Sequence, residues 1–132
     1  MSWDVALLRT EYRTVASIPR DHKPGPIEDR AALIAVLTRS FAGLDARDPS
    51  WLLLDGPDWS IEISLGDSDP IEVITLHVRG ADEVLQVIRN LCEVLGTKAI
   101  DYSTGEFIDF DGDPGRGLRG WRALLARATG KS

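Results

Sequence analysis

Cysteine, histidine and long apolar runs are scarce in this chain, and each scarcity excludes a class of protein. The single cysteine, Cys92, has no partner for an internal disulfide and does not form a thiolate zinc site alone. The two histidines, His22 and His77, are too few for a catalytic zinc held by three histidine ligands. No run of about 18 apolar residues is present, so no transmembrane helix is predicted. We therefore expect neither metal nor cofactor, and no membrane partner.

The N-terminal residues do not look like a secretory leader. No basic segment precedes the first apolar run, and Asp4 interrupts that run. The single cysteine also gives no sign of a disulfide framework of the kind secreted proteins use. We therefore expect a cytoplasmic protein.

Basic residues are outnumbered and unevenly distributed. The chain has 21 acidic and 15 basic residues, a net charge of −6 and a pI near 4.8, so nucleic-acid binding is not expected. Residues 43–113 hold 16 acidic and 4 basic residues, whereas residues 114–132 hold 5 basic and none acidic. This pattern predicts either a solvated acidic face beside a basic last helix, or an acidic surface that attracts a basic partner.

The 132 residues suit one domain, 1–132, that is long enough to bury a core. Hydrophobic periodicity predicts helices over 29–41, 81–95 and about 118–128, and strands over 3–8, 51–54, 61–65, 71–78, 98–102 and 106–110. Three prolines place 10–28 in a loop, and 114–132 is predicted to be a basic helix and tail. This order favours an α+β fold: a single antiparallel or mixed sheet of about five to six strands, with two to three helices and the long ones on one face.

One constellation of polar residues is typical of a ligand site. His77 and Arg79 share a strand face, and Asp101, Ser103 and Glu106 lie at what we expect to be a neighbouring strand end. A small-molecule-binding domain or minor enzyme would use these five residues. Histidine, aspartate and serine also form nucleophilic triads, but no G-x-S-x-G turn accompanies them. We therefore expect no enzyme activity.

Two other motifs have ordinary structural interpretations. Asp109, Asp111 and Asp113 have the spacing of a calcium loop, but Pro114 and Gly120 stand where that loop needs glycine and glutamate. An acidic turn is the better interpretation. Cys92 lies on the apolar face of helix 81–95, which is typical of a small buried residue.

The tryptophans fall into two groups. Trp51 and Trp121 fit core positions, and Trp3 fits a position beneath the first strand. Trp59 follows the Gly56-Pro57-Asp58 turn. There it would be either an exposed interface anchor among acidic residues or an aromatic packed against the sheet edge.

Three segments of the chain are considered together: MSWDV at residues 1–5, WSIEI through DPIE to LHVRG within 59–80, and DYSTGEFID at 101–109. They resemble a family of small bacterial proteins that are associated with immunity to polymorphic toxins and contact-dependent inhibition systems. The resemblance implies a compact fold without catalytic machinery, whose surface binds one cognate toxin.

The acidic block and this resemblance lead to one hypothesis. We expect an immunity protein that neutralises a basic protein toxin by covering its active site with an acidic surface. The sequence leaves the oligomeric state open. The expected contact residues lie in turns and on one hairpin: Asp55, Asp58, Trp59, Glu62, Asp67 and Asp69.

Overall fold

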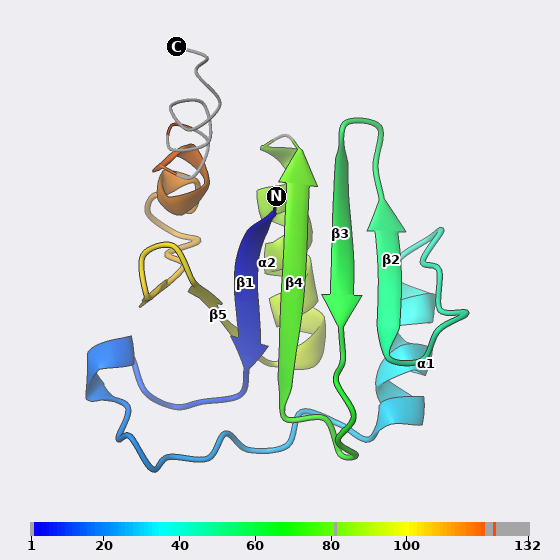
Figure 1. The fold of residues 1–132 in the computed structure, drawn as a ribbon, viewed down its shortest axis with the longest axis horizontal. Helices are drawn as coiled ribbons and strands as arrows, with labels where there is room; N and C mark the ends of the chain where they lie inside the picture. The colour runs from blue at the N-terminus through cyan, green and yellow to red at the C-terminus, as the bar shows by residue number, and fades with distance from the viewer. Residues whose placement is uncertain (1, 81, 121–122, 124–132) are drawn as a thin grey trace.

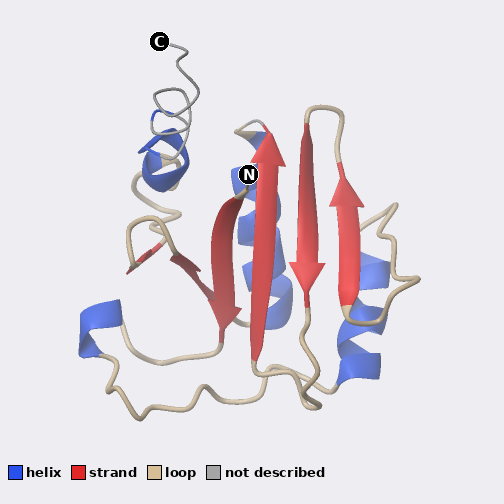
Figure 2. Cartoon of the chain, viewed as in Figure 1, coloured by secondary structure: helices blue, strands red, loops and turns tan. Residues whose placement is uncertain are grey.

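A six-stranded antiparallel sheet forms the centre of the molecule (Figures 1 and 2). The computed structural model describes residues 2–80, 82–120 and 123. The strands lie in the order β2-β3-β4-β1-β5-β6. Their bounds are β1 Trp3–Leu8, β2 Trp51–Asp55, β3 Trp59–Ser64, β4 Val73–Gly80, β5 Lys98–Asp101 and β6 Glu106–Phe107. The helices are α1 Arg30–Ser40, α2 Glu83–Leu95 and the 3₁₀ turn η1 Val15–Ser17, which interrupts the predicted loop.

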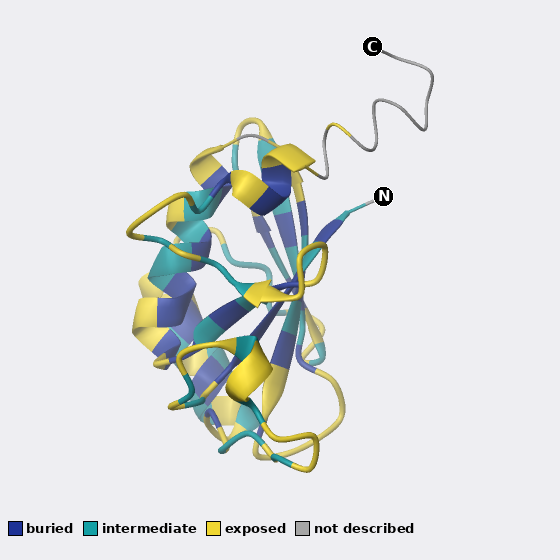
Figure 3. Cartoon of the chain, turned by 90° about the vertical axis from the view of Figure 1, so that its left-hand side faces the viewer, coloured by how far each residue is buried: buried dark blue, intermediate teal, exposed yellow. Residues whose placement is uncertain are grey.

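Both long helices lie behind the sheet in Figure 1, and the side view in Figure 3 places them on one side of it. Alternate strand residues point toward them, including Ile61 and Ile63 of β3 and Leu76 of β4, each at most 1% exposed. Leu33 and Leu37 of α1 and a stripe of α2 complete the same buried cluster. The predicted α+β fold is confirmed, with its sheet fully antiparallel.

Helix α1 is fixed at its start by two aspartates. Asp29, the first residue of the predicted helix, is its N-cap and accepts the Ala32 N–H. Asp69, from the loop after β3, accepts the Arg30 N–H at 3.0 Å. The Arg30 guanidinium donates to the carbonyls of Pro49, Gly66 and Ser68, so this helix end connects two loops.

The last predicted strand is shorter than the sequence indicated. β6 ends at Phe107, and one further bond, from Ile108 N–H to the Ala99 carbonyl, extends the pairing. The Asp109 carboxylate then accepts the N–H groups of Asp111 and Gly112, which turns the chain. The prediction of a strand through residue 110 was wrong because this aspartate turn competes with strand pairing.

The last helix begins earlier than predicted. Residues 116–120 and residue 123 are helical, and Leu118 is fully buried in the core. The remainder of the predicted helix, including Trp121, lies outside the described residues.

Two tryptophans of the β2–β3 hairpin face opposite sides of the sheet. Trp51 is 39% exposed, so its predicted core position was wrong; Leu52 and Leu54 occupy the inward positions of β2. Trp59 is half-buried and packs against the core, with its indole directly over Gly56. Because strand residues alternate in direction, the pairing of β2 with β3 that points Leu52, Leu54 and Ile61 inward also points Trp51 outward and Trp59 inward.

Candidate functional site

The sheet face opposite α1 and α2 is covered by no described helix (Figures 1 and 3). We call it the open face. The register of β2, β3, β4 and β1 places its side chains, which are Trp51, Leu53, Asp55, Ser60, Glu62, Ser64, Val73, Thr75, His77, Arg79, Asp4, Ala6 and Leu8. Two large apolar side chains on it are exposed, Trp51 at 39% and Val73 at 41%. An uncovered sheet face with exposed apolar groups is typical of a contact surface.

His77 lies at the centre of the open face and has two neighbours from other strands. Its Nδ1 is 2.9 Å from Asp4 Oδ1 on β1, and Asp4 Oδ1 also accepts the Ser2 hydroxyl at 2.6 Å. The indole of Trp51 stacks on the imidazole, with ring centroids 5.3 Å apart and an interplanar angle of 17°. Arg79 pairs with Glu62 at 3.5 Å. The face therefore combines a fixed aromatic pair with several carboxylates.

The six expected contact residues do not form one patch. Asp55 and Asp58 are exposed at the β2–β3 end of the sheet, and Glu62 is beside them on the open face. Asp67 and Asp69 lie in the loop after β3, at the other end of a six-residue strand that spans about 20 Å. Trp59 points to the helix-covered face, as its packing against the core shows.

The residues of the expected ligand site likewise lie on different sides of the sheet. His77 and Arg79 are on the open face, whereas Asp101 pairs across the sheet with buried Val5 and is 3% exposed. Asp101 Oδ1 accepts the Trp3 indole N–H at 2.8 Å and the Ser103 hydroxyl at 2.6 Å. Glu106 lies 3.3 Å from Arg116. Asp101 is thus a structural carboxylate, on the other side of the sheet from His77.

The geometry on the open face does not assemble a nucleophile. No described serine or threonine hydroxyl hydrogen-bonds to His77, and the hydroxyl of Ser2 instead bonds to Asp4. In the described part of the chain, no group of three histidine, cysteine or carboxylate side chains is arranged to hold a metal ion.

Sequence reasoning missed two members of the open face, Asp4 and Trp51. Asp4 alternates with Trp3 and Val5, a signal that places it on a polar strand face. Its proximity to His77 depends on β1 pairing with β4, which are 73 residues apart at this contact. No local pattern specifies such a pairing.

No family model, curated protein or solved structure matched this chain. Among the helices of the described residues, none combines the length and apolar character needed to cross a bilayer.

Proposed function

We propose that this protein binds a basic protein toxin through its open face and the adjoining β2–β3 turn, and that this contact neutralises the toxin. The observation that carries the proposal is the exposed Trp51, held against His77 within a face that also presents Asp4, Asp55 and Glu62. Rigid aromatic side chains at the centre of a contact supply much of its binding energy.

Charge supports a basic partner. Asp55 and Asp58 are exposed and make no hydrogen bond or ion pair within the described residues. Glu62 pairs with Arg79 at 3.5 Å, and Asp4 Oδ1 lies 2.9 Å from His77 Nδ1. Free carboxylates at the β2–β3 turn beside the open face speed the approach of a cationic surface and favour it over an anionic one.

The immunity role rests on the three segments that resemble the toxin-immunity family. An immunity protein acts by tight contact with one partner, and this function needs no catalytic group of its own. An anionic inhibitor of a toxin that acts on nucleic acids would occupy the cationic site that otherwise receives phosphate. We therefore place the partner's active site against the open face.

The test is protection from a purified partner. Affinity purification from the native host supplies the partner, and its expression alone should stop growth while coexpression with the wild-type protein restores growth. Two exposed valines provide matched variants: Val73 on the open face, 41% exposed, and Val94 on α2, 39% exposed. Val73→Ala and Trp51→Ala should weaken the complex, whereas Val94→Ala should not. Equal binding by all three variants, or no toxic partner, would refute the proposal.

A further inference from the structure

The side of the sheet that carries the open face continues across β5 and β6. Leu8 of the open face pairs with Lys98 of β5. Ala6 pairs with Ile100, and Ile100 pairs with Phe107 of β6. Side chains of paired residues point to the same side of a sheet, so Lys98 and Phe107 lie on the open-face side. β5 is four strands from β2, which places this region about 20 Å from the β2 end of the open face.

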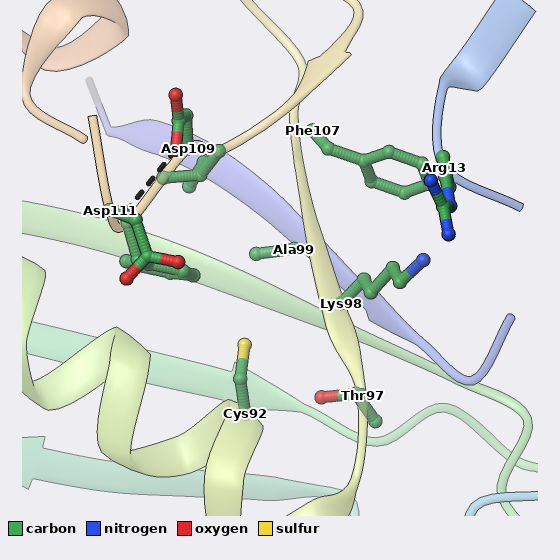
Figure 4. A pocket seen from close by; sticks show the side chains of 10 residues that line it. Arg13, Cys92, Thr97, Lys98, Ala99, Phe107, Asp109 and Asp111 are labelled. Carbon is green, nitrogen blue, oxygen red and sulfur yellow. Dashed lines mark hydrogen bonds between the residues drawn. The ribbon is translucent and has the colours of Figure 1, made fainter. Parts of the chain in front are cut away.

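Two cavities meet at this edge of the sheet. One of about 510 Å³ is lined from both sides of β5, and one of about 680 Å³ lies between η1 and the turn that joins β5 to β6. Arg13 and Phe107 line both cavities, Lys98 lines only the first, and Val15 lines only the second. Figure 4 shows Arg13, Lys98 and Phe107 on one side of β5, with the Cys92 thiol on the opposite side. We call the space bordered by Arg13, Lys98, Phe107 and Val15 the edge site; its volume suits a small molecule.

The two cations of the edge site have no carboxylate partner among the described residues. Arg13 is exposed and makes no hydrogen bond or ion pair there. Lys98 Nζ donates to the Tyr12 carbonyl, which leaves two of its protons available. Glu106 also borders the second cavity, but its carboxylate is 3.3 Å from Arg116. Two cations that share a space without a counterion repel each other, so an anion bound between them is favoured.

We propose that the edge site binds a small aromatic phosphomonoester. The phosphate lies between Arg13 and Lys98, because a phosphomonoester carries about two negative charges near neutral pH and so matches two cations. The aromatic body lies along Phe107 and Val15. The site is on the same side of the sheet as the open face but uses none of its side chains, and binding requires no toxin. The inference therefore goes beyond the proposed function, and either one can fail without the other.

The test uses phenyl phosphate as the probe and the full chain, without any toxin, as the receptor. In a titration at pH 8 followed by amide NMR, saturable shifts are expected at Arg13, Lys98 and Phe107. Phenyl sulfate has the same shape and one negative charge fewer, so it should bind about tenfold more weakly. The proposal is overturned if no saturable shift occurs, if the shifts centre on Cys92 across the strand, or if the two esters bind equally.

Matched variants separate the charge from the ring. Arg13→Gln should weaken binding of phenyl phosphate about tenfold, because it removes one charge-assisted contact. Arg39→Gln is the control: Arg39 is exposed in the last turn of α1, which lies behind β2 in Figure 1, so this change removes the same charge far from the site and should leave affinity unchanged. Phe107→Leu should weaken binding of phenyl phosphate more than binding of inorganic phosphate, which has no ring. Equal losses from both arginine variants, or equal losses for both anions with Phe107→Leu, would overturn the proposal.

Discussion

Asp101 is a carboxylate buried where strand, turn and last helix meet. Its Oδ1 accepts bonds from Trp3 and from the backbone and hydroxyl of Ser103. Its Oδ2 lies against Gly117, so close that a Cβ there would be 1.5 Å from the oxygen. A buried carboxylate is tolerated when its lone pairs are occupied in this way. Asp101 therefore restricts the residue at position 117 to glycine.

Gly117→Ala should destabilise the protein by about 1–3 kcal/mol, because the new methyl group must displace Asp101 or the helix backbone. Gly120→Ala is the control within the same helical segment: apart from its neighbours along the helix, none of the described residues has an atom within 4 Å of its Cβ position. In helices alanine is favoured over glycine by up to about 1 kcal/mol, so Gly120→Ala should be neutral or stabilising. Urea denaturation of both variants measures the difference, and equal effects would contradict the packing argument.

Cys92 makes the free energy of unfolding depend on pH in the alkaline range. Burial raises the pKa of its thiol from 9.0 to about 11, so folding favours the protonated form. The resulting stabilisation is complete below about pH 9 and is lost as the pH rises through 11, by up to about 3 kcal/mol. The free energy of unfolding of Cys92→Ala should therefore fall less between pH 8 and pH 10.5 than that of the wild type. Parallel curves for the two proteins would show that the thiol has the same pKa in the folded and the unfolded state.

At the scale of elements, the loop after β3 holds α1 in place. Asp69 accepts the Arg30 N–H, whereas Asp67, two residues earlier in the same exposed loop, makes no bond within the described residues. Asp69 thus has a structural role, whereas Asp67 is a free surface charge. From the sequence, both had been placed among the expected contact residues.

Asp69→Ala should lower the free energy of unfolding by about 1 kcal/mol, as the loss of a helix cap does. Asp67→Ala should change it by less than about 0.5 kcal/mol, as expected of a free surface side chain. Thermal unfolding compared at constant pH measures both. A loss of similar size from Asp67→Ala would mean that loop charge, rather than the bond to α1, governs this helix end.

Local patterns predicted the elements but not their neighbours. Alternation in Ile61–Leu65 and the three–four repeat in α2 predicted both elements because one face of each is buried. Local patterns carry no information on which strands pair at long range. The combination of His77 with Asp4 and Trp51 depends on such pairings, as does the separation of His77 from Asp101. Single members of the open face, such as His77, Arg79 and Glu62, were consequently named from the sequence without their geometry, and Asp4 and Trp51 were missed.

At the scale of the whole molecule, the acidic block of residues 43–113 is divided in space by β3. Asp55 and Asp58 lie at one end of that strand, and Asp67 and Glu72 lie beyond its other end; all four are exposed. Charges separated by about 20 Å are independent at physiological salt, where the screening length is about 8 Å. Trp51 pairs with Ser64 and so lies at the end of β3 that carries the second pair, whereas the β2–β3 turn carries the first pair. A partner that covers this turn, as proposed, should therefore respond to the first pair, and a partner that covers only the Trp51 end should respond to the second.

Two double variants test this with equal net charge. Asp55→Asn with Asp58→Asn and Asp67→Asn with Glu72→Gln each remove two negative charges, so general attraction of a basic toxin falls equally in both. The first should slow association with the toxin several-fold at low salt, and the loss should shrink as salt rises, while the second should remain near wild type. Stopped-flow or surface-based kinetics measure these rates. Equal slowing by both variants would show that net charge alone attracts the partner, and greater slowing by the second would place the contact at the Trp51 end of β3, away from the β2–β3 turn.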